Sequence, residues 1–351
     1  MFAVQDEIAA AIAAKLQVTF VPPAEPAGRA TTAEVEAFEL VAKGRALFAQ
    51  RGVSLIQARQ CLERAIAVMP DHADAHALLG DTLVATVRYG LLPVSEGRPL
   101  AKAALARALA LDPTHAEAMG AQALTSLLFE HDPRAAFSWW EQALALQPRL
   151  SEVRAAYAVN GLWCYAQDMP RAIAELARAA ADDPLSANCA GMHGFMLATS
   201  GQSAAAVAET QRAQALDAQS FIAAYGCIVA LILTDDPMAG VAAVNNTMAR
   251  FGRHPLFLQF LPFAYLKHGD VERAQQAYAE LRARSAIDAV PRSALAFAAI
   301  PLGHIDQAIE DALESVARSD ALNPWWTLRP FITDAFRAHP RYPELLRAMG
   351  L

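Results

Sequence analysis

The fold is decided by a stretch that reads AKAALARALALDP between residues 101 and 113. Within it, Ala101, Leu105 and Ala108 lie four and three residues apart, and Pro113 follows five residues later. This spacing places three apolar residues on one face of a helix. The two alanines allow a neighbouring helix to approach closely, and the proline then ends the helix.

The same pattern occurs four more times along the chain. Its copies are Ala58/Leu62/Ala65/Pro70, Ala136/Trp140/Ala143/Pro148, Ala172/Leu176/Ala179/Pro184 and Ala206/Thr210/Ala213, where Ala218 replaces the proline. Successive copies lie 43, 35, 36 and 34 residues apart, so the underlying unit is about 34 residues long with insertions. A period of this length is typical of stacked helical hairpins.

The repeated string resembles the second helix of the tetratricopeptide repeat (TPR). Candidate first helices precede the later copies, at residues 77–80, 192–194 and 261–262, with an insertion at 89–93. Degenerate units continue through residues 269–278 and 303–308. The resemblance implies an all-α fold, a right-handed α-α superhelix (TPR solenoid) of about eight helical hairpins.

Composition narrows the class of protein. Hydrophobic residues make up 55% of the chain, enough for a continuous core, and the net charge of -7 provides no basic face for a phosphate backbone. We therefore expect no direct binding of nucleic acid. The four cysteines Cys61, Cys164, Cys189 and Cys227 are widely spaced without a C-x-x-C pair. They are expected to be small core residues in a reducing compartment.

Localisation is expected to be cytoplasmic. The first helix carries Asp6 and Glu7 and lacks a basic leader before an apolar run, so it does not read as a secretory signal. The longest strongly apolar stretch, residues 221–233, is too short to span a bilayer and fits a buried helix.

The two ends of the chain resemble a specific family. Residues 2–9 read FAVQDEIA, and residues 43–48, 89–93 and 339–351 continue the match. Bacterial multidomain signalling proteins carry such a helix at the end of a domain resembling the amino-terminal domain of TolB, followed by TPRs. In that family an adenylate cyclase domain or a winged-helix DNA-binding domain commonly lies upstream.

The resemblance implies four regions. They are a helix that ends the upstream TolB-like domain (1–17), a Pro-rich linker (18–34), the TPR solenoid (35–318) and a helical C-terminal tail (319–351). No cyclase metal site and no recognition helix can be assigned to this chain.

Catalytic motifs are missing from the sequence, which has no Gly-rich phosphate loop, H-E-x-x-H or G-x-S-x-G. We therefore expect this chain to have no enzymatic activity and to bind no cofactor and no metal. His72 and His76 lie four residues apart and could share a metal, but solvated histidines at a helix start are the simpler expectation. Trp140 occupies a repeat column and is expected in the core, whereas Trp325 and Trp326 have no such assignment.

A groove is expected along the first helices. In TPR domains each first helix carries a small residue at the same position of the repeat, and the residue directly after it faces the concave side. Together with neighbouring columns, this predicts a partner-binding groove of Leu124, Val159, Met192, Phe195, Tyr225, Val229, Phe260, Phe263 and Phe297, with Asp81 at its start. The groove becomes apolar toward the C-terminus, and the Lys, Asn and Arg set that clamps a C-terminal carboxylate is not recognisable. Such a groove suits an amphipathic helix or an extended apolar segment of a partner. The alternatives are a groove filled by the chain itself, through closure or by residues 325–336, and a homodimer.

These observations predict a protein interaction scaffold or adaptor. Two alternatives remain: the regulatory arm of a larger adenylate cyclase or transcription regulator, and a receptor for a small ligand or peptide. Pro262 lies inside a first helix, removes a backbone donor and is expected to bend the chain near residues 258–262.

Overall fold

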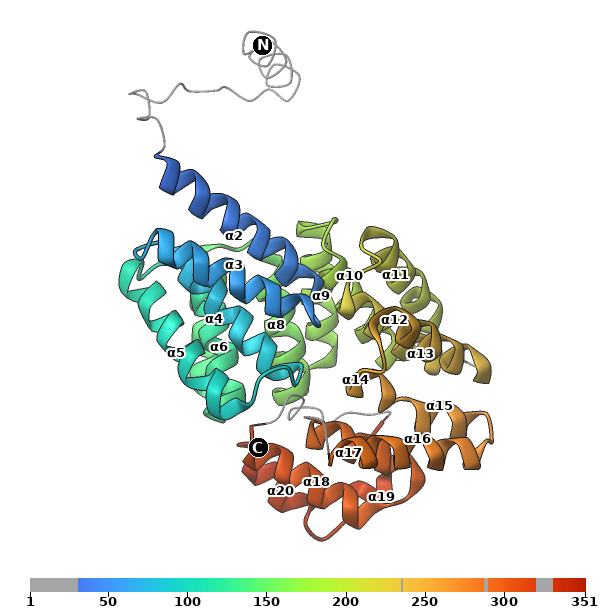
Figure 1. Cartoon of the computed structure of the whole chain (residues 1–351). Helices are drawn as coiled ribbons and strands as arrows, with labels where there is room; N and C mark the ends of the chain where they lie inside the picture. The colour runs from blue at the N-terminus through green and yellow to red at the C-terminus, as the bar shows by residue number, and fades with distance from the viewer. Residues whose placement is uncertain (1–30, 235, 287–289, 320–330) are drawn as a thin grey trace.

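The computed structural model describes residues 31–234, 236–286, 290–319 and 331–351, in which helices form the only regular secondary structure (Figure 1). The first helices of successive hairpins are α2 (Thr32–Gln50), α4 (Ala73–Arg88), α6 (Ala116–Phe129), α8 (Ser151–Ala156) with the π-helix η1 (Tyr157–Tyr165), α10 (Ala187–Thr199), α12 (Phe221–Ile232), α14 (Pro255–Leu258) with α15 (Leu261–Lys267), and α17 (Arg292–Ala299) with the 3-10 turn η2 (Ile300–Leu302). The second helices are α3 (Ser54–Val68), α5 (Val94–Leu111), α7 (Pro133–Leu146), α9 (Met169–Asp182), α11 (Ser203–Leu216), α13 (Pro237–Phe251), α16 (Val271–Arg284) and α18 (Ile305–Ala317). Two short helices follow, α19 (Asp334–Arg337) and α20 (Tyr342–Ala348). The described part thus forms the expected superhelix of helical hairpins.

The repeated string forms the second helix of the first five hairpins, as predicted. Every alanine and every large residue of its five copies is fully buried, including Trp140 and Thr210. The first helices fit around these side chains through glycines. A Cβ on Gly80 would lie 2.5 Å from Leu105 Cγ, which is too close for any residue other than glycine.

Polar side chains start many of the helices. Asp132, Asp168, Ser186 and Ser220 each accept a hydrogen bond from a backbone N–H in the first turn of the helix that follows. Such N-caps satisfy donors that the helix itself leaves unpaired. His72 does the same for α4, since its Nδ1 accepts from the Ala75 N–H at 3.4 Å.

The histidine pair near residue 72 therefore has a structural explanation. His76 Nε2 lies 2.8 Å from the Pro70 carbonyl oxygen, and within the described ranges no three His, Cys, Asp or Glu side chains come together as a metal site would require. Both histidines are half-buried rather than solvated.

The superhelix closes on itself near its N-terminus. The turn after α2 meets α12, where a Cβ on Gly52 would lie 2.9 Å from Phe221 Cδ2. The insertion after α4 approaches the same ring, because Tyr89 packs edge-on against Phe221 with centroids 4.9 Å apart. Two connections of the first two hairpins thus reach across the concave side to the sixth hairpin.

The C-terminal helices contact the third hairpin. A Cβ on Gly350 would lie 3.2 Å from the His131 carbonyl oxygen in the α6–α7 turn, and Ser319 Oγ lies 3.5 Å from His131 Nε2. Figure 1 shows the C-terminus beside the first half of the solenoid.

Aromatic rings fill the C-terminal half of the predicted groove. Phe195 contacts Tyr225, Tyr225 contacts Phe260 and Phe260 contacts Phe297, with ring centroids 5.1–6.1 Å apart. Phe331 covers the C-terminal end of this row, where it packs against Phe260, Phe263 and Phe297. The apolar columns of the later repeats therefore pack against each other and against the C-terminal segment, because burial stabilises these large side chains more than exposure along a groove.

Pro262 marks the predicted break. α14 ends at Leu258 and α15 begins at Leu261, so the first helix of the seventh hairpin is interrupted just before the proline. The neighbouring Gln259 is buried, and its Oε1 has no hydrogen-bond partner among the described residues.

Several sequence assignments meet the edges of the described region. α2 begins at Thr32, so its first turn lies within the stretch assigned to the linker. The helix expected at residues 1–17 and the Trp325–Trp326 pair lie outside the described residues. Cys164, Cys189 and Cys227 are buried as expected, whereas Cys61 is only partly buried, and all four are free thiols.

Candidate functional site

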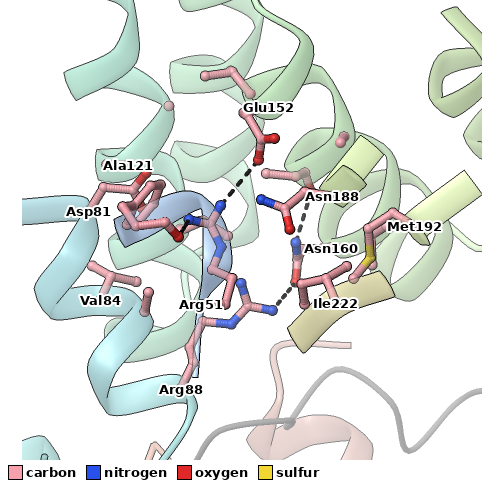
Figure 2. Close-up of a pocket in the computed structure, with 18 of the residues that line it drawn as sticks. Arg51, Asp81, Val84, Arg88, Ala121, Glu152, Asn160, Asn188, Met192 and Ile222 are labelled. Carbon is pink, nitrogen blue, oxygen red and sulfur yellow. Dashed lines mark hydrogen bonds and ion pairs between the residues drawn. The ribbon is translucent and has the colours of Figure 1, made fainter. Parts of the chain in front are cut away.

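Two adjoining cavities lie on the concave side of the first five hairpins. The inner cavity has a volume of about 120 Å³ and lies among α4, α6, η1 and α10 (Figure 2). The outer cleft has a volume of about 430 Å³ and lies at the N-terminal ends of α6, α8 and α10. Both are lined by Phe48, Arg51, Asp81, Glu152, Val153 and Asn188.

Arg51 lies where the two cavities meet because of an unusual turn. Its φ is 61°, and Gly52 follows at φ 57°, so two consecutive residues have a positive φ after α2. The Arg51 guanidinium carbon lies 3.6 Å from the centre of the Phe48 ring. The same guanidinium donates to the Phe48 carbonyl oxygen at 2.6 Å and pairs with Glu152 at 3.1 Å.

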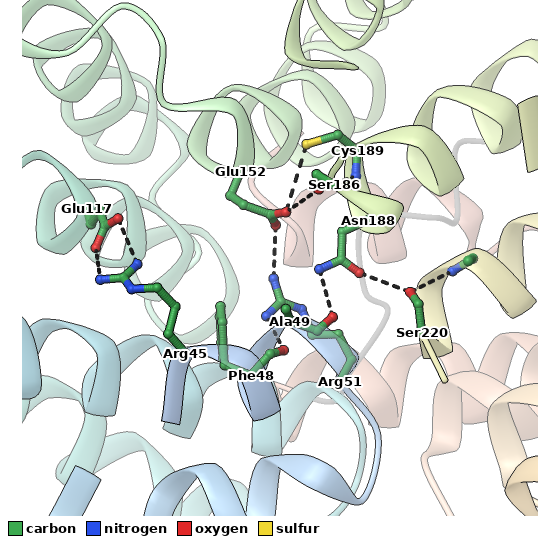
Figure 3. A network of polar contacts seen from close by, with 11 residues as sticks. Arg45, Phe48, Ala49, Arg51, Glu117, Glu152, Ser186, Asn188, Cys189 and Ser220 are labelled. Atoms are coloured by element: carbon green, nitrogen blue, oxygen red, sulfur yellow. Dashed lines mark hydrogen bonds and ion pairs between the residues drawn. The ribbon is translucent and has the colours of Figure 1, made fainter. Parts of the chain in front are cut away.

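Further polar contacts hold the end of α2 against later first helices (Figure 3). Arg45 donates two hydrogen bonds of 2.9 Å to the Glu117 carboxylate at the start of α6. Asn188 in α10 donates to the Ala49 carbonyl oxygen at 2.9 Å and accepts from the Ser220 hydroxyl at 3.3 Å. The first hairpin is thereby attached directly to the third and fifth, and through Asn188 to the sixth.

Asp81 contributes a carboxyl group that no other described residue reaches by hydrogen bond or ion pair. Burial raises its pKa to about 6, and the nearby Glu152 and Glu117 carboxylates add to this effect, whereas Arg51 and Arg88 oppose it. An ionisable group of this kind in a cavity is typical of binding and catalytic sites.

Arg88 lies two helical turns after Asp81 on α4. Its guanidinium donates one long hydrogen bond, 3.3 Å, to Asn160 Oδ1, and its buried Nε has no partner in the described part of the chain. Burial lowers the pKa of Arg88, and the positive charge of Arg51 acts in the same direction. No carboxylate of a described residue lies within ion-pair distance of Arg88, so this cation is unpaired within the described fold.

Asn160 reaches Arg88 from a π-helix. Residues Tyr157–Tyr165 form η1, and the Asn160 amide nitrogen donates to the Ala156 carbonyl oxygen at 2.9 Å. Segments of π-helix are rare and often lie at functional sites. A Cβ on Gly161 would lie 2.9 Å from Trp140 Cζ3, so the indole that replaces leucine in the third repeat packs directly against this widened helix.

The apolar wall of the inner cavity includes three of the nine predicted groove residues: Leu124, Val159 and Met192. Of the other six, Phe195, Tyr225, Val229, Phe260 and Phe297 are buried in the core, and Phe263 is half-buried against Phe331. The structure therefore brings Leu124, Val159 and Met192 together at one cavity, whereas Phe195 and the predicted residues of the later hairpins pack against other side chains of the chain.

The repeat positions that were predicted to face the groove did not identify most of the charged residues of the site. Arg51 lies in the turn after α2, and Arg88 lies at the end of α4 next to the insertion, so neither occupies a groove column. Asp81 does occupy the repeat position that faces the groove, and it is the one polar residue among the copies of that position. A charged residue at an otherwise apolar column was the signal that could have identified this site.

The described helices include none that is long and apolar enough to cross a membrane. No protein-family model matches the sequence, and no curated protein sequence does.

Solved structures match the fold. A chain of the APC/C hetero-tetramer Cut9-Hcn1 is 16% identical, with a TM-score of 0.57 over 88% of this chain. This chain spans 55% of the length of that one. Human IFIT1 dimers solved with PPP-AAAA and with m7Gppp-AAAA are each 17% identical, with TM-scores of 0.51 and 0.53 over 87% of this chain and 76% and 75% of IFIT1. At these identities the matches concern the fold, which is the α-α superhelix of TPR proteins.

Proposed function

We propose that this chain is a protein interaction scaffold that binds a segment of a partner protein on the concave side, along the outer cleft and into the inner cavity. The observation that carries the proposal is the difference between the two halves of the solenoid. The C-terminal half fills its concave side with its own aromatic rings, whereas the N-terminal half keeps two adjoining cavities lined by polar and apolar side chains.

The lining of these cavities favours a polypeptide. Leu124, Val159 and Met192 offer an apolar wall for one side chain of the partner, and the charged groups around Arg51 offer partners for its backbone and polar side chains. Sites that combine apolar walls with a few placed polar groups suit such ligands. A phosphate backbone is disfavoured, because Asp81 and Glu152 face the same space and the chain carries a net charge of -7.

Binding rather than catalysis fits the lining of the inner cavity. Among the described residues that line it, none is Ser, Thr, Cys or His, and burial raises the pKa of the Tyr89 phenol, which also lines the cavity and is therefore a poor nucleophile. We propose no enzymatic activity and no cofactor for this chain.

A peptide selection tests the proposal. Peptides selected from a random displayed library on the wild-type chain should lose at least about tenfold in affinity to Met192→Glu, because the added carboxylate would be buried in the inner cavity. The matched control is Leu146→Glu, since Leu146 is 49% exposed on the second helix α7. Peptides that bind both variants equally well would show that the concave site is not where the chain binds its partner.

The resemblance of the chain ends supports a context for this scaffold. We propose a cytoplasmic bacterial signalling protein, in which the solenoid is the sensory or scaffolding arm. An immunoblot of the native host with antibody against the solenoid tests this. A band well above 37.6 kDa is expected for a multidomain regulator, whereas a band at 37.6 kDa would identify a free-standing adaptor.

A further inference from the structure

Two opposite charges face the inner cavity from the same helix, and no described residue neutralises either of them through an ion pair. Asp81 and Arg88 both line the cavity, and they are seven residues apart on α4, close to two turns. Seven residues correspond to about 10.5 Å along the helix axis, so the two side chains need not meet each other. No hydrogen bond or ion pair joins Asp81 to Arg88, and Glu152 pairs with Arg51 instead of Arg88.

We infer that the inner cavity binds a small zwitterion with an apolar side chain, in the chemical class of the aliphatic α-amino acids. This goes beyond the proposed function, because the ligand is a small molecule and needs no partner protein. Its ammonium group would donate to the Asp81 carboxylate and its carboxylate would accept from the Arg88 guanidinium. Its side chain would lie against Leu124, Val159 and Met192, which line the same cavity.

The distances suit such a ligand. From covalent bond lengths, the ammonium nitrogen and a carboxylate oxygen of an α-amino acid lie about 3 Å apart. With charge-assisted hydrogen bonds of about 2.8 Å at each end, such a ligand bridges at most about 8.6 Å between the two side-chain ends, which is less than the axial separation of about 10.5 Å between the two Cα atoms. The Arg88 side chain is long and helical side chains tilt toward the N-terminus of their helix, so Arg88 extends back toward Asp81.

The charge balance also favours a zwitterion over a single ion. With Asp81 ionised, the cavity lining contains the two cations Arg51 and Arg88 and the two anions Asp81 and Glu152. A ligand with one net charge would leave a buried charge uncompensated, which is strongly unfavourable. A zwitterion neutralises Asp81 and Arg88 and keeps the lining balanced.

The volume sets the size of the ligand. The cavity measures about 120 Å³, and an apolar cavity of about 150 Å³ in another protein holds a benzene molecule. Valine, leucine and methionine each have more heavy atoms than benzene, so a ligand of this size fills the inner cavity and extends past Asp81, which lines both spaces, into the adjoining outer cleft.

Isothermal titration calorimetry on the full chain tests the inference. The probes are L-valine, L-leucine and L-methionine, with 3-methylbutylamine and 4-methylpentanoate as analogues that each lack one of the two charges. We expect at least one amino acid to bind, and both one-charge analogues to bind at least about tenfold more weakly, since each loses a charge-assisted hydrogen bond.

Two variants assign the charges. Asp81→Asn and Arg88→Gln should each weaken amino-acid binding by about tenfold or more, with the thermal melting of each variant recorded to confirm that it folds. The matched controls are Asp71→Asn and Arg64→Gln, because Asp71 and Arg64 are exposed and do not line the cavity. Absence of binding by all three amino acids at about 10 mM, equal binding of a one-charge analogue, or binding unchanged in both cavity variants would each overturn the inference. A peptide selected on the chain that still depends on Met192 would leave the proposed partner binding standing in those cases.

Discussion

The guanidinium of Arg51 stacks 3.6 Å above the ring of Phe48 and pairs with Glu152, which lies 101 residues further along the chain. This contact joins the turn after the first helix to the fourth hairpin. Arg51 borders both the inner cavity and the outer cleft, so the same side chain closes the superhelix and shapes the candidate site.

Loss of the Arg51 contacts should loosen the first hairpin. We expect Arg51→Gln to lower the free energy of unfolding by about 1–2 kcal/mol, because it removes a cation–π contact and an ion pair that is partly buried. Hydrogen exchange should become faster in α2 and remain unchanged in α16 and α18. Arg59→Gln is the control, since Arg59 forms an exposed pair with Glu63 within α3, and it should cost less than about 0.5 kcal/mol.

Gly52 should be more sensitive to substitution than other glycines with a positive φ. Gly52→Ala places a Cβ 2.9 Å from Phe221 Cδ2 in addition to the backbone strain at φ +57°. Gly201→Ala is the matched control, because Gly201 has φ +82° and no atom within 4 Å of an added Cβ. In urea titrations, we expect Gly201→Ala to lower the free energy of unfolding by about 1 kcal/mol. Gly52→Ala should lower it by about 1–3 kcal/mol more than Gly201→Ala does. Equal costs would contradict the close approach of the α2–α3 turn to α12.

Asp81 should make the stability of the protein depend on pH. Its pKa is raised from 3.8 to about 6 in the folded chain, so the folded state holds a proton that the unfolded state has already released between these two values. Stability is therefore greatest below about pH 4 with respect to this group, and it falls as the pH rises to about 6. Above pH 6 the ionised carboxyl destabilises the fold, by about 2 kcal/mol after allowance for its partial exposure.

Asp81→Asn removes this penalty. The variant should be more stable than the wild-type chain at pH 7.5 and equally stable at pH 4, as measured by urea unfolding at both values. Asp71→Asn serves as the control with no such pH-dependent gain. A variant that is less stable than the wild type at pH 7.5 would contradict the assignment of an unpaired, buried carboxyl.

The buried alanines of the repeated pattern should not tolerate replacement by larger side chains. Ala143 is fully buried in α7, so Ala143→Trp should overpack the interface and lower the free energy of unfolding by about 3 kcal/mol or more. Ala145 is exposed two residues later on the same helix, and Ala145→Trp should cost less than about 0.5 kcal/mol. Chemical denaturation of both variants compares the two faces of the helix directly.

The architecture could be predicted from the sequence because each copy of the repeat shows the same pattern of buried residues. The column that contains Leu62, Leu105 and Trp140 is buried in every copy, and Pro262 interrupts its helix as expected. Residues at the same repeat position have the same neighbours, so one correctly assigned column fixes the register of all.

The filling of the groove was only an alternative at the sequence level. Phe195, Tyr225 and Phe260 occupy the concave columns, but their exposure depends on the curvature of the superhelix and on a segment far along the chain. Phe331 packs against Phe260, Phe263 and Phe297 from a part of the chain that lies outside the repeats. Contacts between distant segments, such as Arg51 with Glu152, leave no periodic trace in a single sequence.

The central claim is that partner binding occurs at the concave site of the first five hairpins. The most direct test is to place a photo-crosslinking amino acid at Met192 or at Leu146, irradiate the native host cells, and map the crosslinked peptide by mass spectrometry. We predict a partner segment crosslinked from position 192 and not from position 146, and the same segment, made synthetically, should bind the wild-type chain at least about tenfold more tightly than Met192→Glu. Crosslinks from position 146 alone, or a segment that binds Met192→Glu as tightly as the wild type, would contradict the account.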